Sequence, residues 1–374
     1  MADYTSPLRS LQQGHWFKLI CGASYQHLPA VRNLVLAYTL AGADCIDVAA
    51  DPAVIAVARD AIATAIDLSP KTPHPVLMVS LNDGEDPHFR KATLNPERCP
   101  TDCSQPCVTI CPADAIIFPS PDGVLVDQCY GCGRCLPVCP IAQITTIAHT
   151  AKPETVGPLI EVGGVQALEI HTQVGRITEF QRLWQVLAPF ISRLQVLAIS
   201  CPDGEGLLDY LASLYDLMAP LPCPLIWQTD GRPMSGDIGD GATRATVLLA
   251  EKVLQAQLPG YVQLAGGTNW HTIAKLKAKG LLHPHLMVSP SGIKAPQHHV
   301  AGIAYGSYAR HQLATIQTEL EMLPTHQLED HPVLLQRAIA VAVSLVGELK
   351  PAVFNRLPVA TEHGRDSPAS SFLR

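Results

Sequence analysis

The sequence has few aromatic and charged residues. Phe, Trp and Tyr make up 5% of its 374 residues, and Asp, Glu, Lys and Arg make up 16%. The 26 basic residues are spread along the chain and the formal net charge is -7. No basic stripe or arm is therefore present to bind a phosphate backbone, and nucleic acid is not expected as a partner.

The sequence also shows no targeting segment and no long uninterrupted apolar run. Its first residues lack a basic stretch followed by an apolar one, so no secretory signal is expected. The most apolar stretches, 31–43 and 333–349, are short or interrupted by Gln336 and Arg337, and neither is expected to span a bilayer. A cytoplasmic, reducing location is therefore predicted.

Cysteine is abundant by contrast. In a reducing compartment, 12 cysteines indicate metal or redox chemistry rather than a disulfide framework. Most of them fall between Cys99 and Cys139. The other four lie among apolar neighbours and are expected to be small buried hydrophobic residues: Cys21, Cys45, Cys201 and Cys223.

The second half of the cysteine cluster follows the pattern C-x2-C-x2-C-x3-C-P of bacterial ferredoxins, with Cys129, Cys132, Cys135 and Cys139. Three closely spaced thiolates bind one cubane in that pattern, and the cysteine before proline ligates the other cluster. The first half also ends in Cys-Pro, but three residues separate its successive cysteines. This wider spacing leaves open a three-iron or incomplete cluster on the Cys99 side.

The crossing of two such runs predicts two 4Fe-4S clusters. The ligands of the first are Cys111, Cys129, Cys132 and Cys135, and those of the second are Cys99, Cys103, Cys107 and Cys139. A zinc ribbon also uses paired cysteine knuckles, but it leaves both Cys-Pro endings unexplained.

The segment between the two runs is expected to form a short hairpin that turns at 121–123, where the sequence is Pro-Asp-Gly. Its apolar side chains are expected to shield the clusters: Ile116, Ile117, Val124 and Val126.

Short β-rich runs and helical stretches alternate along the rest of the chain, which is typical of βα units and a parallel sheet. The strands are predicted near residues 16, 45, 75, 165, 195, 224, 261 and 300. The helices are predicted at 28–41, 52–66, 176–190, 206–218, 243–257, 268–279 and 307–321.

Eight such strands predict an α/β fold of the TIM-like (β/α)8 barrel type, with a ferredoxin-like module inserted after the third strand. The predicted division is barrel at 1–90 and 151–322, iron-sulfur insert at 91–150, C-terminal helix at 323–350 and disordered tail at 351–374. The C-terminal helix is expected to close the bottom of the barrel or to pair with a partner.

Functional groups of such barrels lie at the carboxyl ends of the strands, where the insert also emerges. Gly266 and Gly267 follow the seventh strand, and Gly306 and Ser307 follow the eighth, the places where these barrels often bind phosphate. A flavin or a phosphorylated ligand is one interpretation of these residues. Relief of backbone strain at strand-to-helix turns is the other.

No catalytic set is evident among the polar residues near the predicted strand ends, and most are expected to be satisfied by neighbouring backbone. These residues are Lys18, Glu169, His171, Asp203, Asp230, Asn269 and His271. The loop at 229–245 is rich in Gly and Asp and is interpreted as either a lid or a turn-rich connection.

The chain resembles the cyanobacterial light-dependent period (LdpA) family. The resemblance is carried by HWFKLICGAS, by the double cysteine motif and by TDGRPMSGDIGDGATRA. It implies an iron-sulfur redox sensor that adjusts circadian period to light through the redox state of the cell. The implied partners are clock input kinases and clock proteins.

Three functional hypotheses follow. The first is a redox-sensing or electron-transfer protein that is not itself an enzyme. The alternative is an oxidoreductase whose barrel binds a flavin or a phosphorylated substrate and receives electrons from the clusters. In a third, the clusters are structural staples of a scaffold.

Overall fold

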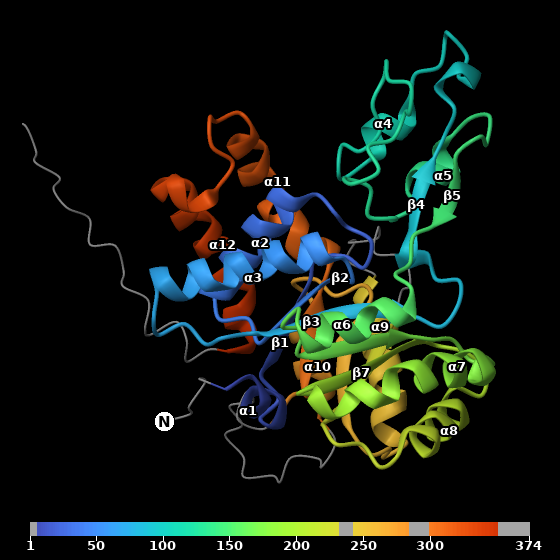
Figure 1. Ribbon diagram of the computed structural model, residues 1–374, viewed down its shortest axis with the longest axis vertical. Helices are drawn as coiled ribbons and strands as arrows, with labels where there is room; N and C mark the ends of the chain where they lie inside the picture. The colour runs from blue at the N-terminus through green and yellow to red at the C-terminus, as the bar shows by residue number, and fades with distance from the viewer. Residues whose placement is uncertain (1–5, 232–241, 284–298, 351–374) are drawn as a thin grey trace, which may run out of the picture.

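Eight parallel strands form a closed barrel in the computed structural model, which describes residues 6–231, 242–283 and 299–350 (Figure 1). The strands are β1 (Trp16–Ile20), β2 (Cys45–Ala49), β3 (Val76–Asn82), β6 (Ala167–His171), β7 (Val196–Pro202), β8 (Leu225–Asp230), β9 (Tyr261–Ala265) and β10 (Gly302–Tyr305). They follow one another around the barrel in chain order, and β10 closes it against β1. The predicted α/β barrel is confirmed.

The helices that follow the strands form the outer layer of the barrel. They are α2 (Leu28–Leu40), α3 (Pro52–Leu68), α6 (Pro153–Glu161), α7 (Ile177–Leu187) continued by η3 (Ala188–Arg193), α8 (Leu207–Met218), α9 (Ala242–Gln255), α10 (Thr272–Lys279) and α11 (Ser307–Glu321). Asp51 caps α3, since its side chain accepts hydrogen bonds from the amides of Ala53 and Val54. The pattern of the sequence missed α6, and it began α10 four residues early.

The interior of the barrel is divided into two layers along its axis. Near the amino ends of the strands, Trp16, Cys45, Met78 and Ile226 pack into an apolar cluster. Leu11 of α1 (Pro7–Gln12) belongs to the same cluster, so α1 covers this end of the barrel. Nearer the carboxyl ends the interior is polar, and this half of the barrel is therefore the one able to bind a ligand.

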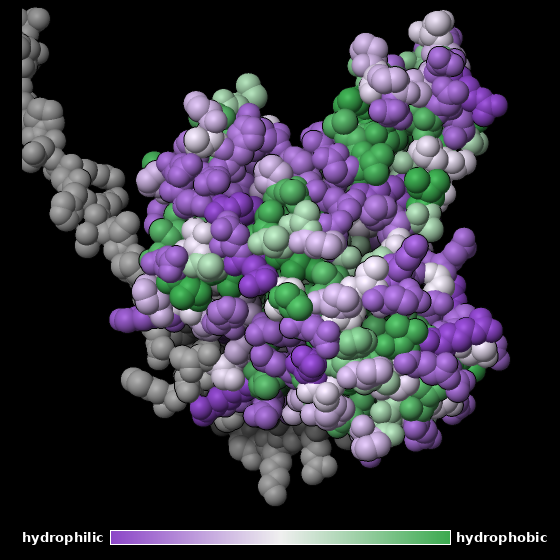
Figure 2. All heavy atoms as spheres, viewed as in Figure 1, coloured by the Kyte–Doolittle hydropathy of each residue, from purple (hydrophilic) through white to green (hydrophobic). Residues whose placement is uncertain are grey.

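The insert leaves the barrel after β3, as predicted, and stands above the barrel (Figure 1). Its base is an antiparallel pair, β4 (Arg90–Thr93) with β5 (Thr145–Ala148). Short helical turns complete it: η1 (Pro87–Phe89), η2 (Pro96–Arg98), α4 (Pro106–Ile110) and α5 (Cys135–Val138). The space-filling view shows a hollow between this module and the neighbouring helices (Figure 2).

The expected hairpin is reduced to a single antiparallel bridge between Ile116 and Val124. Both of these side chains are buried in the module's apolar cluster, as predicted. Val126 is 48% exposed, so its assignment as a shielding residue is wrong. Ile117 is half-buried.

Helix α12 (Pro332–Leu349) packs against α11 and α2 on the side of the barrel and does not close its bottom. It is long and apolar enough to cross a membrane by length and composition alone, but half of it is buried in the fold. This burial accounts for its apolar character. Residues 351–374, predicted to be a disordered tail, lie outside the described residues.

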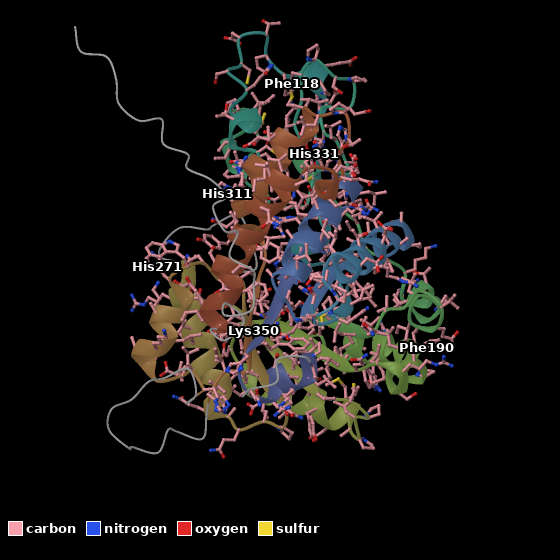
Figure 3. The ribbon with its side chains drawn as sticks, turned by 90° about the vertical axis from the view of Figure 1, so that its left-hand side faces the viewer. Phe118, Phe190, His271, His311, His331 and Lys350 are labelled. Carbon is pink, nitrogen blue, oxygen red and sulfur yellow. The ribbon has the colours of Figure 1, made fainter. Side chains whose placement is uncertain are left out.

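A buried ion pair fixes the end of α12. Lys350 Nζ lies 2.6 Å from Asp44 Oδ1 and donates to the carbonyl of Gly42 at 2.8 Å. Asp44 Oδ2 also accepts the amide of Phe17 at 2.8 Å. Figure 3 shows Lys350 far from Phe118 of the module. The pair therefore connects the last helix to the end of the barrel away from the module.

We predict that Lys350→Ala lowers the free energy of unfolding by about 3 kcal/mol, because it leaves Asp44 charged and unpaired in the interior. Urea denaturation of the full chain measures this change. Arg337→Ala is the control, since it removes an ion pair with Glu319 in which both side chains are exposed. Equal stability of the two variants would contradict a structural role for the Lys350 pair.

Candidate iron-sulfur module and barrel mouth

One cavity of the module is lined by Cys111, Cys129, Cys132 and Cys135. These are the four residues that the crossed ferredoxin pattern assigns to the first cluster. Cys111 comes from the first run of the sequence and the other three come from the second. The fold therefore brings together the set that a cubane needs.

The other four cysteines of the module are Cys99, Cys103, Cys107 and Cys139. Burial raises the pKa of Cys107, and the thiols of Cys139 and Cys99 lie close enough to act in the same direction. Cys103 lies half-buried in a turn closed by its amide and the carbonyl of Pro100. Three members of the predicted second set are therefore neighbours, and the place of Cys103 as a ligand stays a prediction.

Several sulfur atoms accept hydrogen bonds from the module. The amides of Ala92 and Ala115 donate to Cys129 Sγ and Cys111 Sγ, each at 3.3 Å, and Gln143 Nε2 donates to Cys99 Sγ at 2.9 Å. Desolvation opposes ionisation of Cys139, but backbone amides of residues 141–144 outweigh it and lower the pKa of that thiol. Donors of this kind stabilise cluster-bound thiolates.

The first cysteine set has the electrostatics of a site for cations. Burial, together with the thiols of Cys132, Cys129 and Cys111, raises the pKa of Cys135 to about 12. Burial also raises the pKa of Cys132. Cationic iron removes both penalties, because it supplies positive charge where several thiolates converge. The residues present therefore fit an iron-sulfur cluster.

The loop between Cys129 and Cys132 lies directly against the base of the module. Gly131 has a φ of 73°, and a Cβ atom at this position would lie 2.2 Å from the carbonyl oxygen of Arg90 and 3.3 Å from that of Pro87. Only glycine fits this conformation and this contact without displacement of the backbone. The cysteine loop and the segment that enters the module from β3 are therefore held together.

Lys91 occupies the joint between module and barrel. It is buried, and its ammonium donates to Gln26 Oε1 of the β1–α2 loop at 3.0 Å and to the carbonyl of Val126. Burial lowers its pKa, while the nearby Cys129 acts in the opposite direction. The amide of Gln26 also donates to the carbonyl of Asp127 at 3.1 Å, so backbone and side chain join the same two loops.

Inside the barrel, the upper layer contains a buried ionic network. Lys18 Nζ lies 2.9 Å from Asp47 Oδ2 and also contacts Glu169 Oε2. Gln228 Nε2 donates to Glu169 Oε1 at 2.6 Å, and Ser80 donates to Asp47. Burial alone would lower the pKa of Lys18, but Asp47 and Glu169 outweigh it and raise the pKa. Lys18 is therefore a fixed cation and not a nucleophilic amine.

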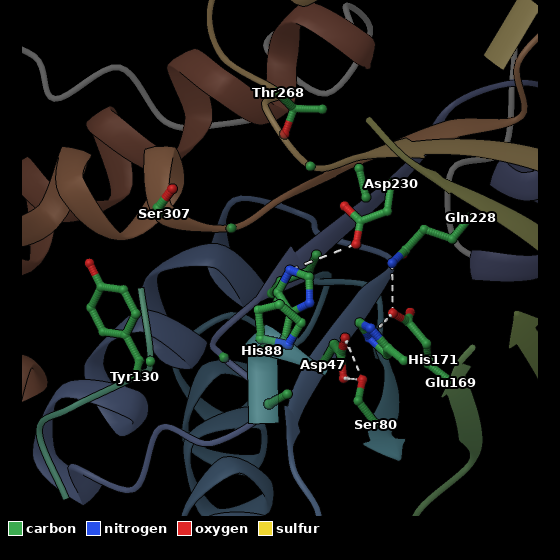
Figure 4. Close-up of a pocket in the computed structure, with 18 of the residues that line it drawn as sticks. Asp47, Ser80, His88, Tyr130, Glu169, His171, Gln228, Asp230, Thr268 and Ser307 are labelled. Atoms are coloured by element: carbon green, nitrogen blue, oxygen red, sulfur yellow. Dashed lines mark hydrogen bonds and ion pairs between the residues drawn. The ribbon is translucent and has the colours of Figure 1, made fainter. Parts of the chain in front are cut away.

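Two histidines lie above this network (Figure 4). His171 Nε2 is 2.7 Å from Glu169 Oε1, and His171 Nδ1 is 3.7 Å from Asp86 Oδ2. His88 Nδ1 is 2.7 Å from Asp86 Oδ1, and His88 Nε2 is 3.7 Å from Asp230 Oδ2. Burial raises the pKa of Asp230, although both imidazoles act against this. Residues of the insert and of the barrel thus meet in one cluster.

A pocket at the barrel mouth joins these groups to the cysteine module. The predicted phosphate-binding residues Gly266, Gly267, Gly306 and Ser307 all line it. His88, Glu169, His171 and Asp230 line it as well, and so do Tyr130 and Gly131 of the cysteine loop. Arg310 closes one side, with its guanidinium 4.3 Å from the centre of the Tyr130 ring and 2.9 Å from the carbonyl of Ile20.

The structure brings together four of the polar residues that lie near predicted strand ends: Lys18, Glu169, His171 and Asp230. The sequence pattern did not indicate that they form one cluster. Asp203 lies elsewhere in an exposed pair with Lys252, and Asn269 accepts the amide of His271 beside α10. The further members are Asp47, Ser80, Asp86, His88 and Gln228.

Asp47 and Gln228 were detectable in principle, as polar residues within otherwise apolar strands. Asp86 and His88 had no signal, because they lie at the entry to the insert, where Asp86 caps the single 3-10 turn η1 and His88 lies within it. Residues 232–241 of the loop at 229–245, interpreted as either a lid or a turn-rich connection, lie outside the described residues.

The fold and the module define the class of this protein: an α/β barrel with an inserted cysteine-rich module of iron-sulfur type. The chain belongs to the light dependent period A family, and the resemblance noted from the sequence is confirmed. The family's C-terminal domain matches residues 159–348, and its Fe-S cluster-binding domain matches residues 99–150.

A curated relative, Light dependent period A of Synechococcus elongatus (strain ATCC 33912 / PCC 7942 / FACHB-805), is 52% identical over 349 residues, which are 93% of this chain and 94% of that protein.

Solved structures with similar folds are much more distant. The carboxyl transferase domain of Rhizobium etli pyruvate carboxylase has a TM-score of 0.40 at 8% identity, over 92% of this chain and 50% of that chain. The N-terminal domain of a putative aldolase from Bacteroides vulgatus has a TM-score of 0.40 at 9% identity, over 91% of this chain and 98% of that chain. Neither supports an argument about function.

We predict that Gly131→Ala lowers the iron and sulfide content of the purified protein, because the methyl group displaces the cysteine loop from Arg90. Gly206→Ala is a matched control: Gly206 has a φ of 74°, but a Cβ atom there would meet nothing within 4 Å. Both variants carry the cost of a left-handed alanine, about 1–2 kcal/mol. Equal iron content in the two variants would show that the contact with Arg90 does not position the loop.

Proposed function

We propose that this protein is a cytoplasmic iron-sulfur redox sensor that couples the redox state of the cell, and thus light, to the period of the circadian clock. The observation that carries the proposal is that the loop of Cys129 and Cys132 lines both the cysteine cavity and the pocket at the barrel mouth. The name of the curated relative supports the biological context.

The proposed cofactors are two 4Fe-4S clusters, which would supply reversible one-electron exchange within a ferredoxin-type module. Cys111, Cys129, Cys132 and Cys135 would hold the first. Cys99, Cys103, Cys107 and Cys139 would hold the second. The crossed sharing of these ligands explains why both runs end in Cys-Pro.

Residues of this chain connect the first cluster site to the barrel surface. Lys91 lies near Cys129 and is bound by Gln26 of the barrel. Tyr130 packs against the guanidinium of Arg310, which in turn donates a hydrogen bond to the carbonyl of Ile20 at the end of β1. A change of charge at the cysteines alters the interaction with Lys91 and Arg310, and a few kcal/mol of such energy suffices to shift a two-state equilibrium.

The proposed partners are proteins, namely the clock input kinases and clock proteins implied by the family resemblance. The hollow between the module and α11 provides a concave surface whose shape depends on both parts of the molecule. Its lining includes Cys111, Tyr130 and Arg310. A partner that binds there would detect the position of the module relative to the barrel.

Amide hydrogen exchange of the oxidised and the dithionite-reduced protein tests the sensor. We predict a redox-dependent difference at residues 86–91 and 306–310, because these segments contact the cysteine loop. The double variant Cys132→Ala/Cys135→Ala should fold its barrel and lose the difference. The same difference in that variant, or reversible reduction of the wild type without any difference, would refute redox sensing and favour structural clusters.

A second prediction concerns Lys91. Lys91→Met should lower the midpoint potential of the cluster held by Cys129, because the ammonium stabilises the more negatively charged reduced form. Protein-film voltammetry or EPR-monitored titration measures the potential. Lys152→Met, which removes an exposed cation before α6, is the control and should leave it unchanged. Equal potentials in both variants would show that Lys91 does not act on the cluster.

The alternative function is an oxidoreductase that accepts electrons from the clusters. It is favoured by one observation: the pocket that adjoins the cysteine loop combines glycine turns at 266–267 and 306 with ionisable groups such as His171 and Asp230. A flavin or a phosphorylated substrate would fit the chemistry of these turns. A resolved flavin absorption band after anaerobic purification would support this alternative over the sensor.

A further inference from the structure

The charges at the barrel mouth are unequal. Four carboxylates, those of Asp47, Asp86, Glu169 and Asp230, lie within the connected network. Lys18 pairs with Asp47 and Glu169. Asp86 and Asp230 instead face the imidazoles of His88 and His171. Burial alone would lower the pKa of His171, but its hydrogen bonds to Asp86 and Glu169 outweigh burial and raise the pKa, so this ring carries a proton when no ion is bound. A bound dication would take the place of that proton.

The same groups have the geometry of a metal site. Asp86, His88 and His171 each offer one ligand atom, and these atoms all lie within 4.8 Å of one another. Two imidazoles and one carboxylate are the ligand set of borderline transition dications such as Fe²⁺, Mn²⁺ and Zn²⁺. Mg²⁺ and Ca²⁺ prefer sites made of oxygen atoms alone.

The environment of His171 supports this assignment. Its Nε2 is bound to Glu169 Oε1 at 2.7 Å, so Nδ1 is left to face Asp86. Glu169 is itself held by Lys18 and Gln228. A carboxylate that fixes the second nitrogen of a histidine is the usual support of a histidine that ligates a metal. The network is therefore built to orient the ring.

The fourth side of the cluster is Asp230. Its Oδ2 lies 3.7 Å from His88 Nε2, at the carboxyl end of β8, and the residue is buried. Asp230 is not among the residues whose ligand atoms lie within 4.8 Å of one another, so it adjoins the site without being one of its ligands. The mouth pocket opens beside it, lined by Gly266 and Gly267. An ion at this place would be accessible to a ligand in the pocket.

We propose that Asp86, His88 and His171 bind one divalent transition-metal ion at the mouth of the barrel, beside Asp230. This site is distinct from the cysteines and does not rest on the redox-sensing function. Two of its ligands come from the segment that enters the module and one from β6. The ion would thus join the module to the barrel.

Manganese provides a test on the intact, cluster-loaded protein. Mn²⁺ is added anaerobically, and the free ion is followed by its room-temperature EPR signal. We expect the wild type to bind one Mn²⁺ per chain. Zn²⁺ should displace it, because such sites bind Zn²⁺ more tightly than Mn²⁺. The soft thiolates of the module, already occupied by iron, do not compete for Mn²⁺.

Two variants identify the ligands. His88→Ala and Asp86→Asn should each weaken Mn²⁺ binding by at least about tenfold. His311→Ala is the control, since His311 is an exposed histidine of α11 outside the cluster. Iron and sulfide are measured on the same samples. Loss of Mn²⁺ binding with full iron content separates this site from the clusters.

The proposal is overturned if the wild type binds no Mn²⁺, or if His88→Ala and Asp86→Asn bind it as the wild type does. In the first case the carboxylates and imidazoles form only an ion-pair network. In the second, the ion is held elsewhere. Neither result bears on the iron-sulfur clusters, whose presence is established separately by the iron and sulfide analysis.

Discussion

Lys91 is bound at once by the two parts of the molecule. Its ammonium donates to Gln26 of the β1–α2 loop and to the carbonyl of Val126 in the module, and the side chain is fully buried. It makes no salt bridge with a carboxylate among the described residues. The hydrogen bonds of this buried cation go to neutral oxygens, which do not neutralise its charge. Its positive charge therefore still attracts nearby anions. Burial lowers the pKa of Lys91, and the charge of Cys129 opposes this more than Asp127 and Asp51 do, so the residue that fixes the joint also acts on the proposed cluster.

The two-layered barrel explains where a ligand can bind. The apolar layer around Trp16 and Ile226 is closed by α1, so the amino-terminal end is a packed core. The ionic layer above it is costly to bury and is tolerated only because Lys18 is paired with both Asp47 and Glu169. This arrangement stabilises the charged layer and presents His171 to the pocket. The amino-terminal half of the barrel thus serves as the packed core, and the carboxyl-terminal half presents polar groups to the pocket.

The sequence was informative where a local pattern decides the structure. The alternation of apolar strands and amphipathic helices predicted all eight strands of the barrel, and the cysteine spacing indicated the module. Lys18, Glu169, His171 and Asp230 were recognised as polar residues at strand ends, but not as one cluster. Their meeting depends on how the barrel closes, because β1, β6 and β8 are far apart in the sequence.

Asp86 and His88 lay beyond such reasoning altogether. They occupy a turn whose course is set by the docking of the module and by a hydrogen bond from Ser24 to the carbonyl of His88. Neither hydrophobic period nor spacing specifies such a contact. The exposed Val126 has the same origin: its strand-like neighbours predicted burial, whereas its carbonyl is turned to Lys91 and its side chain to solvent.

One short segment, residues 86–93, performs most of the coupling between the two parts. His88 of this segment lies at the barrel mouth, and the carbonyl of Arg90 lies against Gly131. The ammonium of Lys91 lies at the joint. Strand β4 pairs with β5 in the antiparallel base of the module, and the amide of Ala92 in this strand donates to Cys129 Sγ. The peptide groups that contact the cysteine loop belong to the same short segment that positions His88. A displacement of the loop therefore also displaces the backbone near His88. The insertion after β3 is what places this segment between the proposed cluster and the pocket.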